Sequence, residues 1–169
     1  TPVTRLVDLD TPAAIIDVDR LQANIQRMQE RMNELGVRFR PHVKTSKCLP
    51  VVNAQLEAGA QGITVSTLKE AEQFFAAGIV DVLYAVGITP AKLPKVLAMR
   101  RQGCQLKILV DNPTAAEAVA DFGKEHDEIF EVWIEVDCDG HRSGIRPDDK
   151  DRLVAVARCL DGGGMRLGG

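Results

Sequence analysis

Residues 37–44 read VRFRPHVK, and the alternation of their side chains decides between two ways of folding this chain. Residues two apart on a β-strand share a face. One face of this segment would be apolar, and the other would carry three ionisable side chains, Arg40, His42 and Lys44. Such a face is unusual in a parallel strand, because helices normally bury both of its sides. The segment therefore indicates a sheet that is polar on one side.

Strand-like and helix-like segments alternate along the chain. Alternating or β-branched apolar runs predict strands at residues 13–18, 37–44, 62–66, 82–86, 106–110 and 130–137, and a last one near Met165. Apolar residues at helical spacing predict helices at residues 21–35, 49–58, 68–77, 91–101, 113–122 and 149–160. Asp19 is the expected N-cap of the first helix, and Gly36 its end. This alternation predicts βαβ units and a parallel sheet.

The polar face recurs in the later strands. It includes Thr64, Ser66, Lys107, Asp111, Glu131, Glu135 and Asp137. Helices cover both faces of a doubly wound sheet, where unpaired polar groups would be costly to bury. In a (β/α)8 TIM-type barrel, by contrast, inward residues near the C-terminal strand ends form the mouth of the active site. We therefore predict an α/β barrel, and we expect this chain to hold about five to six of its βα units, the N-terminal ones, within a longer protein.

Composition and charge exclude several classes of protein. Hydrophobic residues make up 45% of the chain, charged residues 27%, and the net charge is −3. A broad surface for nucleic acid or an acidic membrane is not expected from this balance. The chain has neither a long apolar run nor, in its opening TPVTRLVDLD, the core of a signal peptide, so a cytoplasmic protein is expected. Its four scattered cysteines lack zinc-site spacing and are expected to be reduced thiols.

Lys44 is the candidate for chemistry on the polar face. A lysine amine that is desolvated at a strand end can lose its proton and condense with an aldehyde, as it does when it carries pyridoxal phosphate (PLP). The alternative is a structural ion pair with Asp137, Glu135 or Asp111, and the strand pattern alone leaves both open. His42 should line the same cavity, either tuning the lysine or filling the core. Arg40 lies deeper and is expected to balance inward carboxylates.

Four segments carry a resemblance to a known family. They are TPAAIIDVDRLQANI (residues 11–25), RPHVKTSK (40–47), GITVSTLKEAEQFFAAG (62–78) and EVDCDGHRSG (135–144). In this order they resemble the fold-type III PLP enzymes that include D-threonine aldolase and eukaryotic-type D-serine dehydratase. These enzymes belong to the wider alanine racemase N-terminal barrel superfamily. The resemblance covers the chain from Thr11 to its end.

The resemblance implies a site and a reaction. Lys44 would form the Schiff base with PLP and later remove the substrate Cα proton, with His42 in the same cofactor site. Arg142 matches the family arginine that contacts the phenolic oxygen of PLP; a loop arginine paired with Asp137 or Asp139 is the alternative. The implied activity is a metal-assisted lyase that removes water and ammonia from a D-β-hydroxy amino acid of the D-serine or D-threo-3-hydroxyaspartate type. A D-threonine aldolase, an amino-acid racemase, a non-catalytic PLP-binding barrel and a metabolite-binding barrel without PLP are the alternatives.

The resemblance also implies parts that lie outside this chain. Residues 1–18 would be an N-terminal segment and strand that joins a C-terminal β domain, and residues 19–169 the N-terminal portion of the PLP-binding barrel. A divalent metal, Zn or Mn, would have its ligands beyond residue 169. Family members act on small D-amino acids and are commonly homodimers. We accordingly expect residues 1–169 alone to be catalytically inactive.

Overall fold

Five parallel strands form a single sheet in the computed structural model, which describes residues 5–169. Each strand pairs with the one that follows it in the chain. The strands are β1 (Ile63–Val65), β2 (Asp81–Gly87), β3 (Gln105–Val110), β4 (Glu131–Ile134) and β5 (Arg166–Leu167). The helices are α1 (Val18–Glu34), α2 (Leu49–Glu57), α3 (Leu68–Ala76), α4 (Leu93–Arg101), α5 (Pro113–His126) and α6 (Lys150–Gly162), with short 3-10 helices η1 (Leu6–Asp8) and η2 (Pro90–Lys92).

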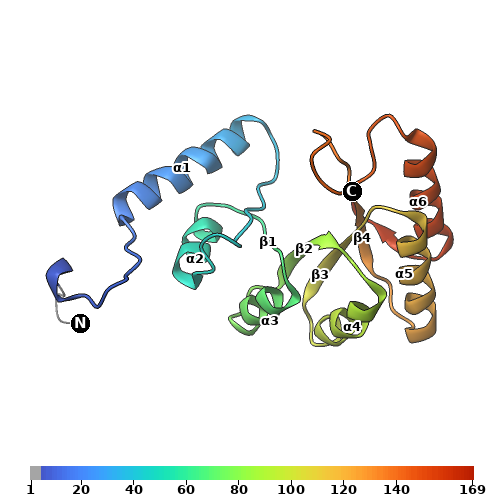
Figure 1. The fold of residues 1–169 in the computed structure, drawn as a ribbon, viewed down its shortest axis with the longest axis horizontal. Coiled ribbons are helices and arrows are strands. Elements are labelled where there is room, and N and C mark those ends of the chain that lie inside the picture. The colour runs from blue at the N-terminus through green and yellow to red at the C-terminus, as the bar shows by residue number, and fades with distance from the viewer. Residues whose placement is uncertain (1–4) are drawn as a thin grey trace.

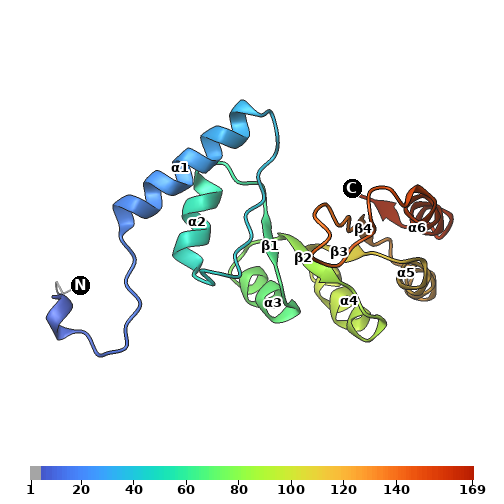
Figure 2. The ribbon, with the colours of Figure 1, turned by 45° about the horizontal axis from the view of Figure 1, so that its top comes forward.

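Helices α3 to α6 follow one another along one side of this sheet (Figures 1 and 2). The buried core lies between them and the strand side chains that face them. Among these side chains, Ile63, Val82, Ile108 and Val132 are fully buried. The single layer of helices excludes a doubly wound sheet and confirms the predicted partial TIM-type barrel, with polar residues on the inner side.

The segment that decided the fold pairs with β1 as the first strand of this arrangement. The Val43 N–H donates to Thr64 O at 2.9 Å, and the Thr64 N–H donates to Pro41 O at 2.8 Å. The pairing is nevertheless limited to one parallel bridge, between His42 and Thr64, so the predicted strand at residues 37–44 is present only as an extended segment. Pro41 interrupts it because proline has no backbone N–H to donate.

The predicted strand at residues 13–18 does not form within this chain. Residues 13–17 have no regular secondary structure, and Val18 already begins α1. A strand needs a neighbour for its backbone groups, and no strand within residues 5–169 lies beside this segment. The N-cap of α1 is Asp17 rather than Asp19, because the Asp17 carboxylate accepts the Arg20 N–H at 3.0 Å.

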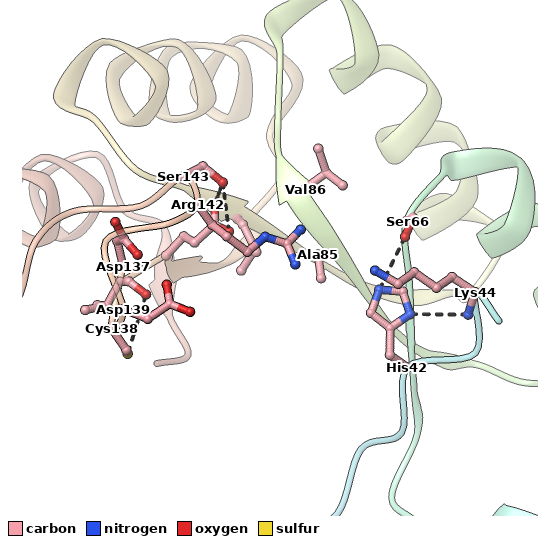
Figure 3. A pocket seen from close by; sticks show the side chains of 13 residues that line it. His42, Lys44, Ser66, Ala85, Val86, Asp137, Cys138, Asp139, Arg142 and Ser143 are labelled. Carbon is pink, nitrogen blue, oxygen red and sulfur yellow. Dashed lines mark hydrogen bonds between the residues drawn. The ribbon is translucent and has the colours of Figure 1, made fainter.

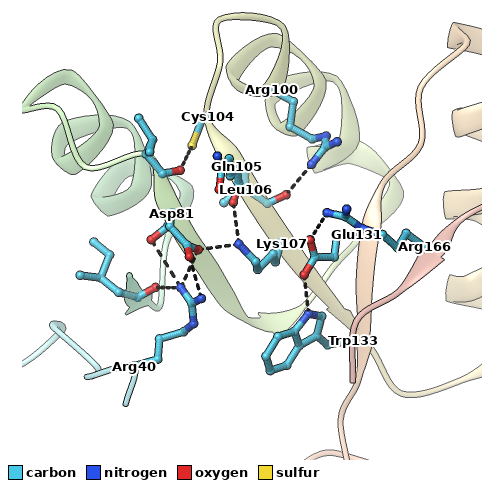
Figure 4. Close-up of polar contacts among 12 residues, drawn as sticks. Arg40, Asp81, Arg100, Cys104, Gln105, Leu106, Lys107, Glu131, Trp133 and Arg166 are labelled. Atoms are coloured by element: carbon cyan, nitrogen blue, oxygen red, sulfur yellow. Dashed lines mark hydrogen bonds and ion pairs between the residues drawn. The ribbon is translucent and has the colours of Figure 1, made fainter. Parts of the chain in front are cut away.

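An ion cluster occupies the inner face near the N-terminal strand ends (Figure 4). The Arg40 guanidinium binds both Asp81 carboxylate oxygens, at 2.7 and 3.0 Å, and Lys107 binds the same carboxylate from β3. This contact confirms that Arg40 balances an inward carboxylate. It also ties the segment before β1 to β2 and β3.

None of the helices within residues 5–169 combines the length and the apolar character that crossing a membrane requires.

Candidate functional site

A cavity of about 350 Å³ opens at the C-terminal ends of the strands, where the barrel fold predicts an active site. Its walls come from the segment before β1, from the ends of β1, β2 and β3, and from the loop after β4 (Figure 3). The lining residues that matter below are His42, Lys44, Ser66, Glu135, Arg142 and Ser143.

Lys44 is the first residue of a turn at the edge of this cavity. The turn closes through the Lys47 N–H, which donates to Val43 O at 2.9 Å. No carboxylate within residues 5–169 pairs with the Lys44 amine, so the predicted alternative of a structural ion pair is not found there. The expected desolvation is not found either: the side chain is exposed, because no further strand of the described chain covers it.

His42 lies between Lys44 and Ser66, and both of its ring nitrogens have partners. Nδ1 accepts the backbone N–H of Lys44 at 3.3 Å, and Nε2 lies 3.3 Å from Ser66 Oγ. An imidazole that accepts at Nδ1 carries its proton on Nε2 when neutral, and it then donates to the serine hydroxyl. Burial lowers the pKa of His42, and the charge of Lys44 lowers it further. The charge of Glu70 raises this pKa, but by less. The ring therefore holds the Lys44 backbone as a neutral acceptor.

Glu70, in the first turn of α3, holds the chain that follows β1. Its carboxylate accepts the N–H groups of Ser66 at 2.8 Å and Thr67 at 3.2 Å, and it pairs with Lys47 Nζ at 3.0 Å. Thr67 in return accepts the Glu70 N–H, which completes a capping box. Glu70 is not among the site residues predicted from the sequence, although the spacing of Thr67 and Glu70 matches the capping-box pattern.

Arg142 is carried by the loop that follows β4. Ser143 Oγ lies 3.1 Å from both carboxylate oxygens of Glu135, which holds the loop against the strand end. Gly144 adopts φ +120°, and a side chain there would meet the Asp137 backbone nitrogen at 2.6 Å. This close approach is available only to glycine. Arg142, two residues earlier in the loop, lines the cavity, and its guanidinium points toward Lys44 and His42 (Figure 3).

The structure therefore brings together the three predicted site residues, Lys44, His42 and Arg142, on one cavity. The alternative pairing of Arg142 with Asp137 or Asp139 is not found: within residues 5–169 Arg142 forms no ion pair, and those carboxylates accept backbone N–H groups of the loop. Ser66 and Ser143 were predicted only as polar or family-like positions, and Glu135 also as a possible partner of Lys44. In the structure Ser66 contacts His42, and Glu135 contacts Ser143 instead of Lys44.

The cavity fits PLP in size and in chemistry. Its volume lies within the range of about 300–1000 Å³ that is typical of small-molecule sites. A primary amine is the group that condenses with an aldehyde, and a guanidinium supplies fixed donors for a phenolate oxygen. Val86 and Leu109 add apolar surface on which a pyridine ring can lie. For a metal the described residues offer no comparable site, since no three His, Cys, Asp or Glu side chains are grouped there.

Comparisons with known proteins support the same fold. Residues 16–169 match the family model described as alanine racemase, N-terminal domain. The chain is 64% identical to D-threo-3-hydroxyaspartate dehydratase from Delftia sp. (strain HT23), over 97% of this chain and 43% of that protein. The solved structure of that dehydratase superposes with a TM-score of 0.96 over the same shares of the two chains.

Two more distant relatives have related activities. D-serine dehydratase from Dictyostelium discoideum is 31% identical over 92% of this chain and 41% of its own length. The solved structure of D-threonine aldolase from Filomicrobium marinum is 28% identical, with a TM-score of 0.80 over 96% of this chain and 43% of that one. The chain thus spans less than half the length of each of these relatives.

Proposed function

The chain belongs to the alanine racemase N-terminal domain family, and from this membership we propose that it is the cofactor-carrying part of a PLP-dependent lyase. The observation that carries the proposal is the meeting of Lys44 and Arg142 on one cavity, from segments that are distant in the sequence. Lys44 is the proposed attachment point for PLP, Arg142 the partner of its phenolic oxygen, and His42 a neighbour that orients the lysine.

The proposed roles follow from the chemistry of each group. When bound, PLP supplies an electron sink that stabilises negative charge at the Cα of an amino acid. Lys44 Nζ would take the Cα proton of the substrate as a general base. The permanent charge of Arg142 holds a negative oxygen in place. The neutral His42 ring fixes the backbone from which Lys44 projects, because it accepts the Lys44 N–H.

The proposed reaction is the removal of water and then ammonia from a D-β-hydroxy amino acid, which leaves a 2-oxo acid. The relative that is 64% identical is a D-threo-3-hydroxyaspartate dehydratase, and this favours that substrate class. The similarity to a D-threonine aldolase supports retro-aldol cleavage as the second candidate. Incubation of the full-length protein with D-threonine distinguishes the two reactions. The products 2-oxobutanoate and ammonia indicate a dehydratase, whereas glycine and acetaldehyde indicate an aldolase.

The parts outside the described site are also proposals. Residues 1–18 would join a C-terminal β domain, and residues 19–169 would form the N-terminal portion of the barrel. A divalent metal with ligands beyond residue 169 would act as a Lewis acid on the leaving hydroxyl. We further propose a cytoplasmic homodimer that acts on small molecules and binds neither nucleic acid nor membranes.

A spectrum of the full-length protein with PLP tests the assignment of Lys44. We expect a visible band from bound PLP that Lys44→Ala abolishes and that the surface substitution Lys69→Ala leaves unchanged. Borohydride reduction followed by peptide mass spectrometry should place the pyridoxyl group on Lys44. A band that survives Lys44→Ala, or a modified peptide elsewhere, would overturn the proposal.

A further inference from the structure

Lys44 lies within a closed ring of contacts, whose first arm runs through the strand ends. The Lys44 N–H donates to His42 Nδ1, and His42 Nε2 meets Ser66 Oγ, each at 3.3 Å. The Ser66 N–H then donates to Glu70 Oε2 at 2.8 Å. Three contacts therefore connect the backbone of the lysine to a carboxylate on α3.

The second arm returns from that carboxylate to the turn that follows Lys44. Glu70 Oε1 pairs with Lys47 Nζ at 3.0 Å, and the Lys47 N–H donates to Val43 O at 2.9 Å. Lys47 has φ +44°, in the left-handed region that costs a non-glycine residue energy. The ion pair connects the side chain of this strained residue to Glu70, so both sides of the Lys44 turn are linked to the same carboxylate.

Glu70 makes more contacts than its capping role needs. In a capping box the glutamate accepts only the N-cap N–H, which here belongs to Thr67. The additional partners are the Ser66 N–H and the Lys47 amine. Glu70 is also buried, with 8% of its surface exposed, whereas Glu72 on the same helix is half-exposed and binds two surface lysines.

The charge of Glu70 is maintained in this buried position. Burial raises the pKa of the carboxyl, but the Ser66 N–H, the Lys47 amine and the Thr67 N–H together lower it by more. The carboxylate is thus ionised near neutral pH, and charge-assisted hydrogen bonds of this kind are about twice as strong as neutral ones.

We infer that Glu70 is a positioning residue for Lys44: its carboxylate joins the Lys44 turn to the strand end that holds His42 and so sets the place of the lysine amine. The inference rests on the proposed role of Lys44. Glu70 and Lys47 are not among the site residues predicted from the sequence.

Titration of the full-length protein with PLP, followed by visible absorbance, tests this role. Loss of charge-assisted hydrogen bonds in Glu70→Gln should weaken PLP binding about tenfold. Lys47→Met should also weaken PLP binding. Lys47→Arg should bind PLP as the wild type does, because the ion pair with Glu70 is kept. Glu72→Gln is the matched control on α3 and should bind PLP as the wild type does.

Thr67→Ala separates positioning from helix capping. This substitution removes the side-chain cap of α3 but leaves the ring of contacts intact. We expect it to lower the melting temperature as Glu70→Gln does, without weakening PLP binding. Equal weakening by the two variants would overturn the inference, because capping alone would then explain the effect.

Hydrogen exchange of the protein without PLP gives a readout that does not depend on the proposed function. The amides of Lys44 and Lys47 should exchange faster in Glu70→Gln than in the wild type or in Glu72→Gln. Unchanged exchange would overturn the ring as a positioning device. Failure of the wild-type protein to bind PLP at Lys44 would instead overturn the proposed function. The exchange rates would still show whether Glu70 holds the Lys44 turn.

Discussion

Lys44 and Arg142 line opposite parts of one cavity, although one lies at the end of the segment before β1 and the other in the loop after β4 (Figure 3). The parallel sheet produces this meeting, because the carboxyl ends of all its strands lie at the same edge. An amine and a guanidinium that face a common space repel each other and favour a ligand with negative charge between them.

Removal of the Arg142 guanidinium should weaken PLP binding. Charge-assisted hydrogen bonds contribute about 1.5–3 kcal/mol, so Arg142→Met should raise the dissociation constant by about ten- to a hundredfold. Arg142→Lys should recover only part of this, because an ammonium lacks the planar set of donors. Arg146→Met is the matched control, since Arg146 is exposed in the same loop and pairs with Asp148. Equal effects of the two Met substitutions would contradict the assignment of Arg142.

Gly144 should tolerate alanine much less well than Gly140 does. Both glycines have positive φ, but only at Gly144 would a Cβ meet backbone, at 2.6 Å from the Asp137 nitrogen. Gly144→Ala should therefore displace the loop and weaken PLP binding, whereas Gly140→Ala should cost about 1 kcal/mol of stability and leave binding intact. PLP titration together with urea unfolding measures both effects. Similar binding by the two variants would mean that the close approach does not orient Arg142.

The Asp81 carboxylate should stabilise the inner face of the sheet. It is two-thirds buried between Arg40 and Lys107 (Figure 4), and Asp81→Asn leaves the excess positive charge there without a partner. We expect a loss of about 3 kcal/mol in the free energy of unfolding. Asp148→Asn, which breaks an exposed pair, should change it by less than about 1 kcal/mol. Urea unfolding near neutral pH provides the comparison.

The same carboxylate should make stability depend on acid. Burial raises the pKa of Asp81, but Arg40 and Lys107 lower it by more, so the folded value lies below the usual one. The unfolded chain then binds the proton more readily, and the stabilisation is present above about pH 4 and is lost as the pH falls through the folded pKa. Asp81→Asn should show a shallower loss of stability over this acidic range. If Asp81→Asn lost stability with falling pH as steeply as the wild type, the Asp81 carboxylate would not be stabilised by Arg40 and Lys107.

Cys138 should react with thiol reagents before Cys104 does. Cys138 is exposed at the cavity, whereas burial raises the pKa of the Cys104 thiol to about 11. Thiolate is the reactive form, so labelling at mildly alkaline pH should modify Cys138 first and Cys104 only on unfolding. Bound PLP should slow the labelling of Cys138, because that residue lines the proposed site. Mass spectrometry of labelled peptides measures the order, and a lack of protection would place PLP elsewhere.

Much of the fold could be read from local patterns. The spacing of apolar residues and the glycines at helix ends predicted most helix bounds to within a few residues. The alternation of Arg40, His42 and Lys44 predicted a barrel with a polar interior. Local patterns failed where pairing was needed: residues 13–18 have strand-like composition, but strand formation requires a neighbour. The one-turn extension of α5 beyond residue 122, to His126, was also missed, since Gly123 within a helix resembles a stop.

The sequence by itself determined the order of the elements and the face on which Lys44 lies, because backbone geometry repeats every two or 3.6 residues and leaves its period in the side chains. Only the tertiary structure decided that Arg40 binds Asp81, that Glu70 pairs with Lys47, and that Arg142 and Lys44 line one cavity. Those arrangements join residues from different βα units. Their distances depend on the register of parallel strands and on loop paths, which no local spacing encodes.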